Sequence, residues 1–198
     1  MLSILLPMFL FCLAGAISPG PVNVIAAHLG ARLGFVRALP HVLGASLSYA
    51  AIVWLVGRGL GGVLQAYPAL AQGLQYLGAA YLLYLSARIA SAPPRSAEAP
   101  APEARSAWLQ GVLSQSLNPK AWLVALSGVG LFVAAGPDSP ALLRVFCAMS
   151  GGVCCVSVGA WAALGTVLRR WLAPARHQLL FNRAMALMLV AAVAAMLA

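Results

Sequence analysis

Ser18-Pro-Gly-Pro-Val-Asn23 interrupts an uncharged run that covers residues 1–31. Proline removes a backbone donor and clashes with the carbonyl group four residues earlier, so this stretch breaks what would otherwise be a membrane-spanning helix. Asn118-Pro119-Lys120 breaks a second apolar run, residues 107–134, in the same way. A packing kink would explain either break alone. Matched breaks in two halves of a chain, however, indicate the binding site of a transporter, because backbone freed at membrane depth needs protein or a watery cavity around it.

The composition indicates an all-α integral membrane protein. Of the 198 residues, 63% are hydrophobic and only 8% are charged, which is too little charge for a soluble surface. A span needs about 20 apolar residues, and the chain supplies six such runs. They lie near residues 2–31, 40–60, 69–90, 107–134, 141–167 and 179–198.

The six runs divide into two repeats of three within a single membrane domain, residues 1–198. Residues 91–106 change abruptly to Ala, Pro, Ser, Glu and Arg, a composition that cannot bury a core and that predicts a flexible cytoplasmic linker. The first three-helix repeat then covers residues 1–90, and the second covers residues 107–198.

The arginines predict the topology. Nine lie in connections that alternate with two others, and positive charge marks the cytoplasmic side. The nine are Arg32, Arg37, Arg88, Arg95, Arg105, Arg169, Arg170, Arg176 and Arg183, against Arg58 and Arg144. A short basic loop at residues 32–37 would be cytoplasmic, and both termini would lie outside. Because three spans is an odd number, the second half runs opposite to the first, which is a 3+3 inverted repeat with broken first and fourth helices.

Several classes of protein are disfavoured. The net charge of +9 does not indicate nucleic-acid binding, because the arginines lie between apolar runs and do not cluster with aromatic residues. The cysteines have neither metal-ligand nor redox spacing, and no nucleophile–base pair is visible. We therefore expect neither an enzyme nor a metal or cofactor. A non-transport membrane protein would not need an ionised residue at two mirrored breaks.

The predicted site is an anion site at the middle of the membrane. In this topology the half-helices that follow Pro21 and Pro119 begin there, and each helix N-terminus carries partial positive charge and unpaired N–H groups. Lys120 adds a full charge, at a cost of about 2.5 to 3.5 kcal/mol on insertion scales. We expect a substrate carboxylate to bind there, and the carbonyls near Ser18 and Leu117 to accept hydrogen bonds from its ammonium group. The predicted binding residues are Ser18, Pro19, Gly20, Pro21, Asn23, Asn118, Pro119 and Lys120.

Alternative roles exist for the charged and titratable residues. Lys120 could instead snorkel, or bond the carbonyls of the broken helices as a purely structural element. His28 and His41 are candidates for coupling transport to protons, against the alternative that they are core or loop histidines.

The sequence resembles the LysE/RhtB family of amino-acid exporters, whose first span carries a Pro-Gly-Pro motif, here Pro19-Gly20-Pro21. The other matching positions are Gly34, Gly44, Gly78-Ala-Ala-Tyr-Leu-Leu-Tyr-Leu85, Gly111 through Asn118-Pro-Lys120, and Asn182-Arg183. Asn23 departs from the family, in which many members carry aspartate there. The resemblance implies six spans, proton-driven amino-acid efflux and a location in the bacterial inner membrane.

The acidic residues predict which substrates fit. Glu98 and Glu103 fall in the linker and Asp138 falls in an outer turn, so no carboxylate is left within a span to pair with a cationic side chain. We expect the export of amino acids with neutral side chains, by a chain that acts in the lipid bilayer alone or as a homo-oligomer. The alternative is an exporter of another small solute or of an inorganic ion, although a cation would require the missing carboxylates.

Overall fold

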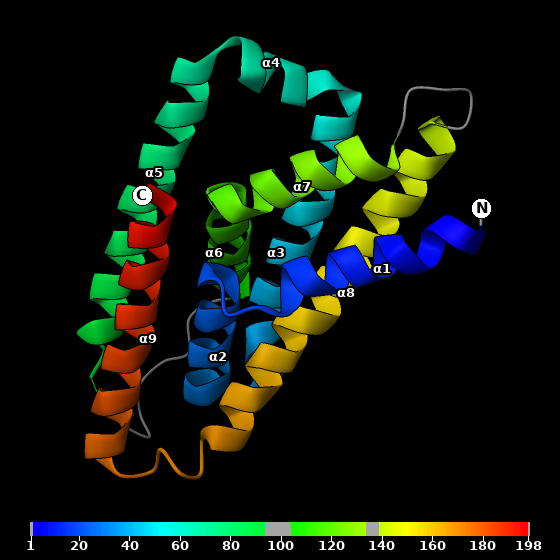
Figure 1. Cartoon of the computed structure of the whole chain (residues 1–198). Coiled ribbons are helices and arrows are strands. Elements are labelled where there is room, and N and C mark those ends of the chain that lie inside the picture. Colours follow the sequence, from blue (N-terminus) through cyan, green and yellow to red (C-terminus); the bar gives the residue numbers. More distant parts are fainter. Residues whose placement is uncertain (1, 94–103, 134–138, 198) are drawn as a thin grey trace.

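The computed structural model of the chain describes residues 2–93, 104–133 and 139–197, and these contain helices and no strand, which confirms the predicted all-α class (Figure 1). In chain order, the elements are α1 (Leu2–Ile17), α2 (Pro21–Leu33), α3 (Phe35–Leu55), the π-helical turn η1 (Val56–Leu60), α4 (Gly61–Ala66), α5 (Pro68–Ala90), α6 (Ala104–Ser116), α7 (Pro119–Phe132), α8 (Ser139–Leu168) and α9 (Ala175–Leu197).

Length and composition allow three or four membrane spans within the described residues. The continuous stretch Phe35–Ala66, α8 and Ala175–Ala195 of α9 qualify alone, and α1 with α2 qualify together as one bent span. By the same criteria α7 is apolar but short, and α5 does not qualify, because Gln72 and Gln75 lower its hydropathy. The six-span inverted repeat therefore stays a prediction.

Two connections are shorter than the sequence predicted. The loop expected at residues 32–37 reduces to Gly34, which has φ 89°, a left-handed conformation that glycine adopts without strain and that reverses the chain in one residue. The linker expected at residues 91–106 ends early, because α6 begins at Ala104. Residues 104–106 are exposed, and their Ala and Arg favour helix without the need to bury apolar surface.

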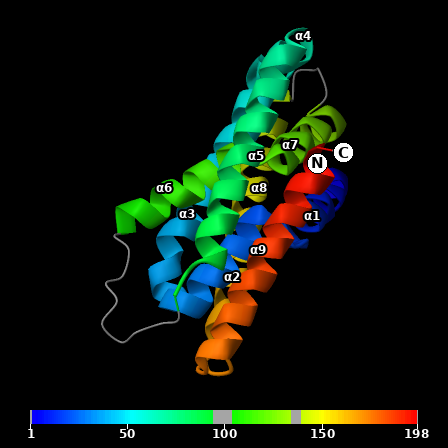
Figure 2. The same cartoon turned by 90° about the vertical axis from the view of Figure 1, so that its left-hand side faces the viewer.

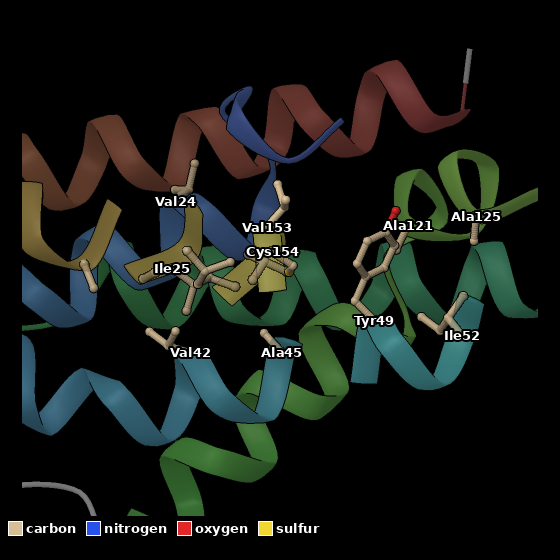
Figure 3. Packing of buried hydrophobic residues seen from close by; sticks show 14 of the residues in the cluster. Val24, Ile25, Val42, Ala45, Tyr49, Ile52, Ala121, Ala125, Val153 and Cys154 are labelled. Carbon is tan, nitrogen blue, oxygen red and sulfur yellow. The ribbon is translucent and has the colours of Figure 1, made fainter. Parts of the chain in front are cut away.

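Helix α2 is the centre of the bundle. Every residue from Pro21 to Ala31 is buried, although a helix at a protein surface would bury only one face. Figure 3 shows Ile25 of α2 facing Val42 of α3, with Cys154 of α8 beside them in the same core. The broken first segment therefore lies inside the protein along its second half.

Glycines set the closest helix crossings. A Cβ atom at Gly30 of α2 would overlap the carbonyl oxygen of Ala162 in α8, and one at Gly165 of α8 would overlap that of Ala27 in α2. The same reciprocal arrangement joins α3 to α6 through Gly44 and Gly111. Small residues of this kind allow helix backbones in membranes to touch.

Helices α1 and α7 lie obliquely across the bundle, whereas α2, α3, α5 and α9 run along it (Figure 1). The axis of α1 is bent by 61° from that of α2. An aromatic cluster holds the oblique pair together, with the rings of Phe11 in α1 and Phe132 in α7 edge to face at 5.4 Å and Phe146 of α8 against both. This packing joins α1 to α7 and α8.

The C-terminal ends of α2, α5 and α8 gather at one end of the bundle, and α4 lies at the other end (Figures 1 and 2). We call these the arginine-rich end and the α4 end. Arg32, Arg88, Arg169 and Arg170 belong to the first, and Arg58, just before α4, belongs to the second. The arrangement agrees with the predicted separation of the arginines.

Candidate functional site

The two broken segments meet in the structure. Lys120, in the first turn of α7, donates a hydrogen bond from Nζ to the Oγ of Ser18, which lies in the break between α1 and α2. A Cβ atom at Gly20 would lie 3.7 Å from the same Nζ. Residues about one hundred positions apart, each singled out from its own half of the sequence, therefore adjoin one another.

Asn23 holds the first break together. Its side-chain amide donates to the carbonyl oxygens of Ala16, at 2.7 Å, and Ser18, at 2.9 Å. Ser157 of α8 donates to the Ala16 oxygen as well, at 2.9 Å, and Trp161 of α8 donates to Ile17 at 3.3 Å. The carbonyls that end α1 thus find donors within the protein, as backbone at membrane depth requires.

Asn118 performs a comparable task at the second break. Its Oδ1 accepts from the backbone N–H of Lys120 at 3.2 Å, which makes it the N-cap of α7, with Pro119 at the first helical position. Its Nδ2 donates to Gln115 Oε1 at 3.4 Å, and Trp122 Nε1 donates to the carbonyl of Ser116 at 2.8 Å. Here too the ends of the broken helix are closed by local side chains.

These contacts differ from one expectation. The sequence suggested that carbonyls near Ser18 would accept hydrogen bonds from a substrate ammonium group. In the structure the Asn23 amide already donates to the Ser18 carbonyl. The reason is geometric. Helix α2 starts at Pro21, so Asn23 lies in its first turn, and its side chain reaches back to the end of α1.

Lys120 is half-buried and has no carboxylate within the described residues to neutralise it. All three acidic residues of the chain, Glu98, Glu103 and Asp138, lie outside those residues. A cavity of about 40 Å³ lies beside the Lys120 side chain, and Gly20, Tyr49 and Gln115 are among the residues that line it. The site therefore combines a positive charge with a small cavity that has both apolar and polar walls.

A larger cleft opens on the other side of Lys120. It has a volume of about 700 Å³ and lies between α7, the α4–α5 hairpin and the C-terminal part of α9. Its walls are largely apolar, with polar side chains at Gln65, Gln72, Gln75, Ser116, Asn118 and Lys120. Pro19, Gly20, Pro21 and Pro119 also line it, so all the predicted binding residues except Ser18 and Asn23 face this cleft. A volume of this size accommodates an amino acid.

Neither candidate histidine lines the cavity or the cleft beside Lys120. His41 of α3 is fully buried near the crossing with α6, and neither ring nitrogen has a hydrogen-bond partner among the described residues. His28 of α2 is 6% exposed, its Nδ1 is likewise without a partner there, and it lines a different cavity at the arginine-rich end. Their part in transport stays a prediction.

Sequence reasoning missed the contribution of α8. Ser157 and Trp161 are one helical turn apart, so both face the end of α1 and both donate to its carbonyls. The signal that could have indicated this role was the presence of two polar donors at this spacing in an otherwise apolar span. Sequence reasoning also missed Trp122, whose indole N–H donates across the second break to the carbonyl of Ser116.

Comparison with known proteins identifies the family. The profile of the LysE type translocators matches residues 13–198, which includes both breaks and all eight predicted binding residues. The chain belongs to this family. It is a membrane protein of a translocator family, as the resemblance of its motifs predicted.

Similar proteins carry a name that specifies a substrate. The cysteine/O-acetylserine efflux protein of Escherichia coli strain K12 is 31% identical over 189 residues, which cover 91% of this chain and 90% of that protein. The protein of the same name from Salmonella typhimurium strain LT2 is 29% identical over 169 residues, 81% of each chain. An uncharacterised membrane protein of Pseudomonas aeruginosa is 33% identical over 132 residues, 63% of this chain and 61% of that one. No solved structure matches the chain significantly.

Proposed function

We propose that this protein exports amino acids with neutral side chains from the cytoplasm, driven by the proton gradient. Its family is one of translocators, and relatives that align with most of the chain are named for the efflux of cysteine and O-acetylserine. Both are amino acids whose side chains carry no charge near neutral pH. These names support export as the activity and neutral compounds as the substrate class.

The single observation that carries the proposal is the meeting of the two breaks at Lys120. Its ammonium group lies where the N-termini of α2 and α7 converge and faces a cleft large enough for an amino acid. A carboxylate that enters the cleft replaces Ser18 as the partner of Lys120 and gains from both helix ends. The gain offsets the cost of holding an ammonium group within the membrane.

The substrate's ammonium group needs acceptors other than the Ser18 carbonyl, to which Asn23 already donates. Tyr49, which carries no charge, lines the small cavity beside Lys120, and we assign this role to its hydroxyl oxygen. A lysine or arginine side chain would therefore enter without a carboxylate partner, at a cost of several kcal/mol.

We further propose the topology that the arginines predict: one membrane domain, a 3+3 inverted repeat in the bacterial inner membrane, and both termini outside. The gathering of the C-terminal ends of α2, α5 and α8 at one end of the bundle supports it. His28 and His41 are the candidates for proton coupling, because each is buried with at least one ring nitrogen that has no partner within the described residues.

The proposal is tested by loading cells with dipeptides and measuring which amino acids leave faster when the protein is present. We expect faster loss of at least one neutral amino acid, such as cysteine, threonine or leucine, and lysine and arginine efflux near background. Selective export of lysine or arginine would contradict the proposed substrate class.

Two matched variants test the role of the charge on Lys120. Lys120→Met should abolish this efflux while the protein reaches the membrane in near-normal amounts, measured by immunoblot. Lys120→Arg keeps the charge and should retain part of the activity. Full transport by the methionine variant would show that Lys120 is structural.

A further inference from the structure

A second group of cationic side chains lies at the arginine-rich end, outside the central site. Arg32 at the end of α2 and Arg169 just after α8 line a cavity of about 20 Å³, together with Gln178 and Asn182 of α9. A Cβ atom at Gly34, the joint between α2 and α3, would lie 3.2 Å from the Arg169 guanidinium. Two guanidinium groups from distant parts of the chain therefore converge on one small cavity.

Arg32 and Arg169 are more buried than the other described arginines of the predicted cytoplasmic side. Arg37, Arg88, Arg105, Arg170, Arg176 and Arg183 are all exposed, whereas Arg32 and Arg169 are half-buried. Neither has a carboxylate partner among residues 2–93, 104–133 and 139–197, because those ranges contain no acidic residue. Charge that only marks the cytoplasmic side needs no burial, so their placement calls for another explanation.

A buried side chain supplies the second observation. His28 is 6% exposed, lines this same cavity, and has no partner for Nδ1 in the described part of the chain. Buried polar atoms without partners are rare, and they commonly mark a place that a ligand or water fills. The C-terminal end of α2 carries about half a negative charge, which two guanidinium groups more than offset.

The cavity has room for one water-sized group, such as a single carboxylate oxygen, with the rest of the ligand outside it. A planar carboxylate matches the fork of a guanidinium, whereas a phosphate is tetrahedral and bulkier. Helix α2 also lines the cavity beside Lys120, so one buried helix connects the arginine-rich end with the central site.

We propose that Arg32 and Arg169 form a cytoplasmic carboxylate site, which binds the carboxylate of the substrate before it reaches Lys120. The inference rests on the proposed function for the identity of that carboxylate. The cleft at Lys120 lies on the α4 side, whereas Gly30 packs closely against α8 toward the arginine-rich end, so a carboxylate held by Arg32 and Arg169 is separated from Lys120 until that packing loosens.

The first experiment measures transport from each face separately. In inside-out vesicles, Arg32→Gln and Arg169→Gln should raise the KM for a neutral amino acid about tenfold, as the loss of a charged hydrogen bond predicts, and leave the maximal rate within about twofold. In right-side-out vesicles the half-saturating concentration for exchange should not change. Arg170→Gln, one residue away on the exposed surface, is the control and should behave as the wild type. Equal effects from both faces, or equal effects of Arg169→Gln and Arg170→Gln, would overturn the inference.

The second experiment needs no transport and uses acetate as the probe. The purified Lys120→Met protein removes the central site from the measurement. Acetate should raise its melting temperature relative to chloride at equal ionic strength, should do so equally with Arg170→Gln added, and should fail to do so with Arg169→Gln added. An unchanged response with Arg169→Gln, or stronger stabilisation by inorganic phosphate, would overturn the carboxylate site. A wild type that moves no amino acid while acetate behaves as expected would overturn the proposed function instead.

Discussion

Asn23 allows a quantitative test of how the first break is stabilised. Replacing it by leucine, which has a similar volume, removes the donor to the carbonyls of Ala16 and Ser18. The Ser18 carbonyl then loses its Asn23 donor, which costs about 1 to 3 kcal/mol for a buried group. The Ala16 carbonyl keeps Ser157 as a donor, so its share is about 1 kcal/mol. We expect Asn23→Leu to lower the free energy of unfolding by about 2 to 4 kcal/mol.

The shared acceptor predicts that two mutations will not be additive. Ser157→Ala alone should cost about 1 kcal/mol, because Asn23 still donates to Ala16. In the double variant the Ala16 carbonyl loses both of these donors, so the combined loss should exceed the sum of the single losses by about 1 kcal/mol or more. The coupling arises only if both side chains contact the same oxygen.

Denaturant titration of the purified proteins in detergent, followed by far-UV circular dichroism, measures these differences. Ser150→Ala is the matched control for Ser157→Ala. Ser150 also lies in α8 and is also buried, but it contacts Cys12 of α1, away from the carbonyls of Ala16 and Ser18. Its effect should add to that of Asn23→Leu within about 0.5 kcal/mol. Additivity of Asn23→Leu with Ser157→Ala would refute the arrangement at the break.

Three other predictions concern glycine, proline and topology. Gly30→Ala should prevent normal accumulation in the membrane, because the added methyl group meets a backbone carbonyl of α8. Normal accumulation of this variant would contradict the tight crossing. Gly20→Ala should fold normally but weaken transport, because its methyl group occupies space beside the Lys120 ammonium group. Pro119→Ala should reduce efflux in the dipeptide assay at unchanged abundance, because the helix can then close over the site, and full efflux would argue against the break. Reporter fusions after Arg37 should report the cytoplasm and fusions after Gly62 the outside, and the reverse result would invert the topology.

Much of the site could be predicted because proline acts locally. Pro19, Pro21 and Pro119 lack a backbone N–H donor whatever surrounds them. Their positions alone therefore predict that helices end or begin close by, as α1, α2 and α7 do. Asn118 beside Pro119 is also a local signal, since a cap bonds its own first turn. Membership of the family followed from the same motifs and was confirmed.

Hydropathy alone determined less about where segments end. The apolar runs near residues 141–167 and 179–198 overlap α8 and α9, but hydropathy could not show that α2 and α3 join at Gly34 alone, or that α6 begins at Ala104. Those boundaries depend on hydrogen bonds and backbone conformation at the ends of helices, which contribute little to the average hydropathy of a window.

The tertiary structure alone decided what each polar side chain contacts. That Lys120 reaches Ser18, that Ser157 shares the Ala16 carbonyl with Asn23, and that Arg169 lies over Gly34 all depend on how helices distant in sequence are rotated against each other. Close crossings such as Gly30 with α8 and aromatic packing between α1 and α7 fix those rotations. The sequence by itself predicted both breaks and, through the inverted-repeat topology, that they lie at the same depth, whereas the side chains that meet across them were decided by packing, which no local pattern encodes.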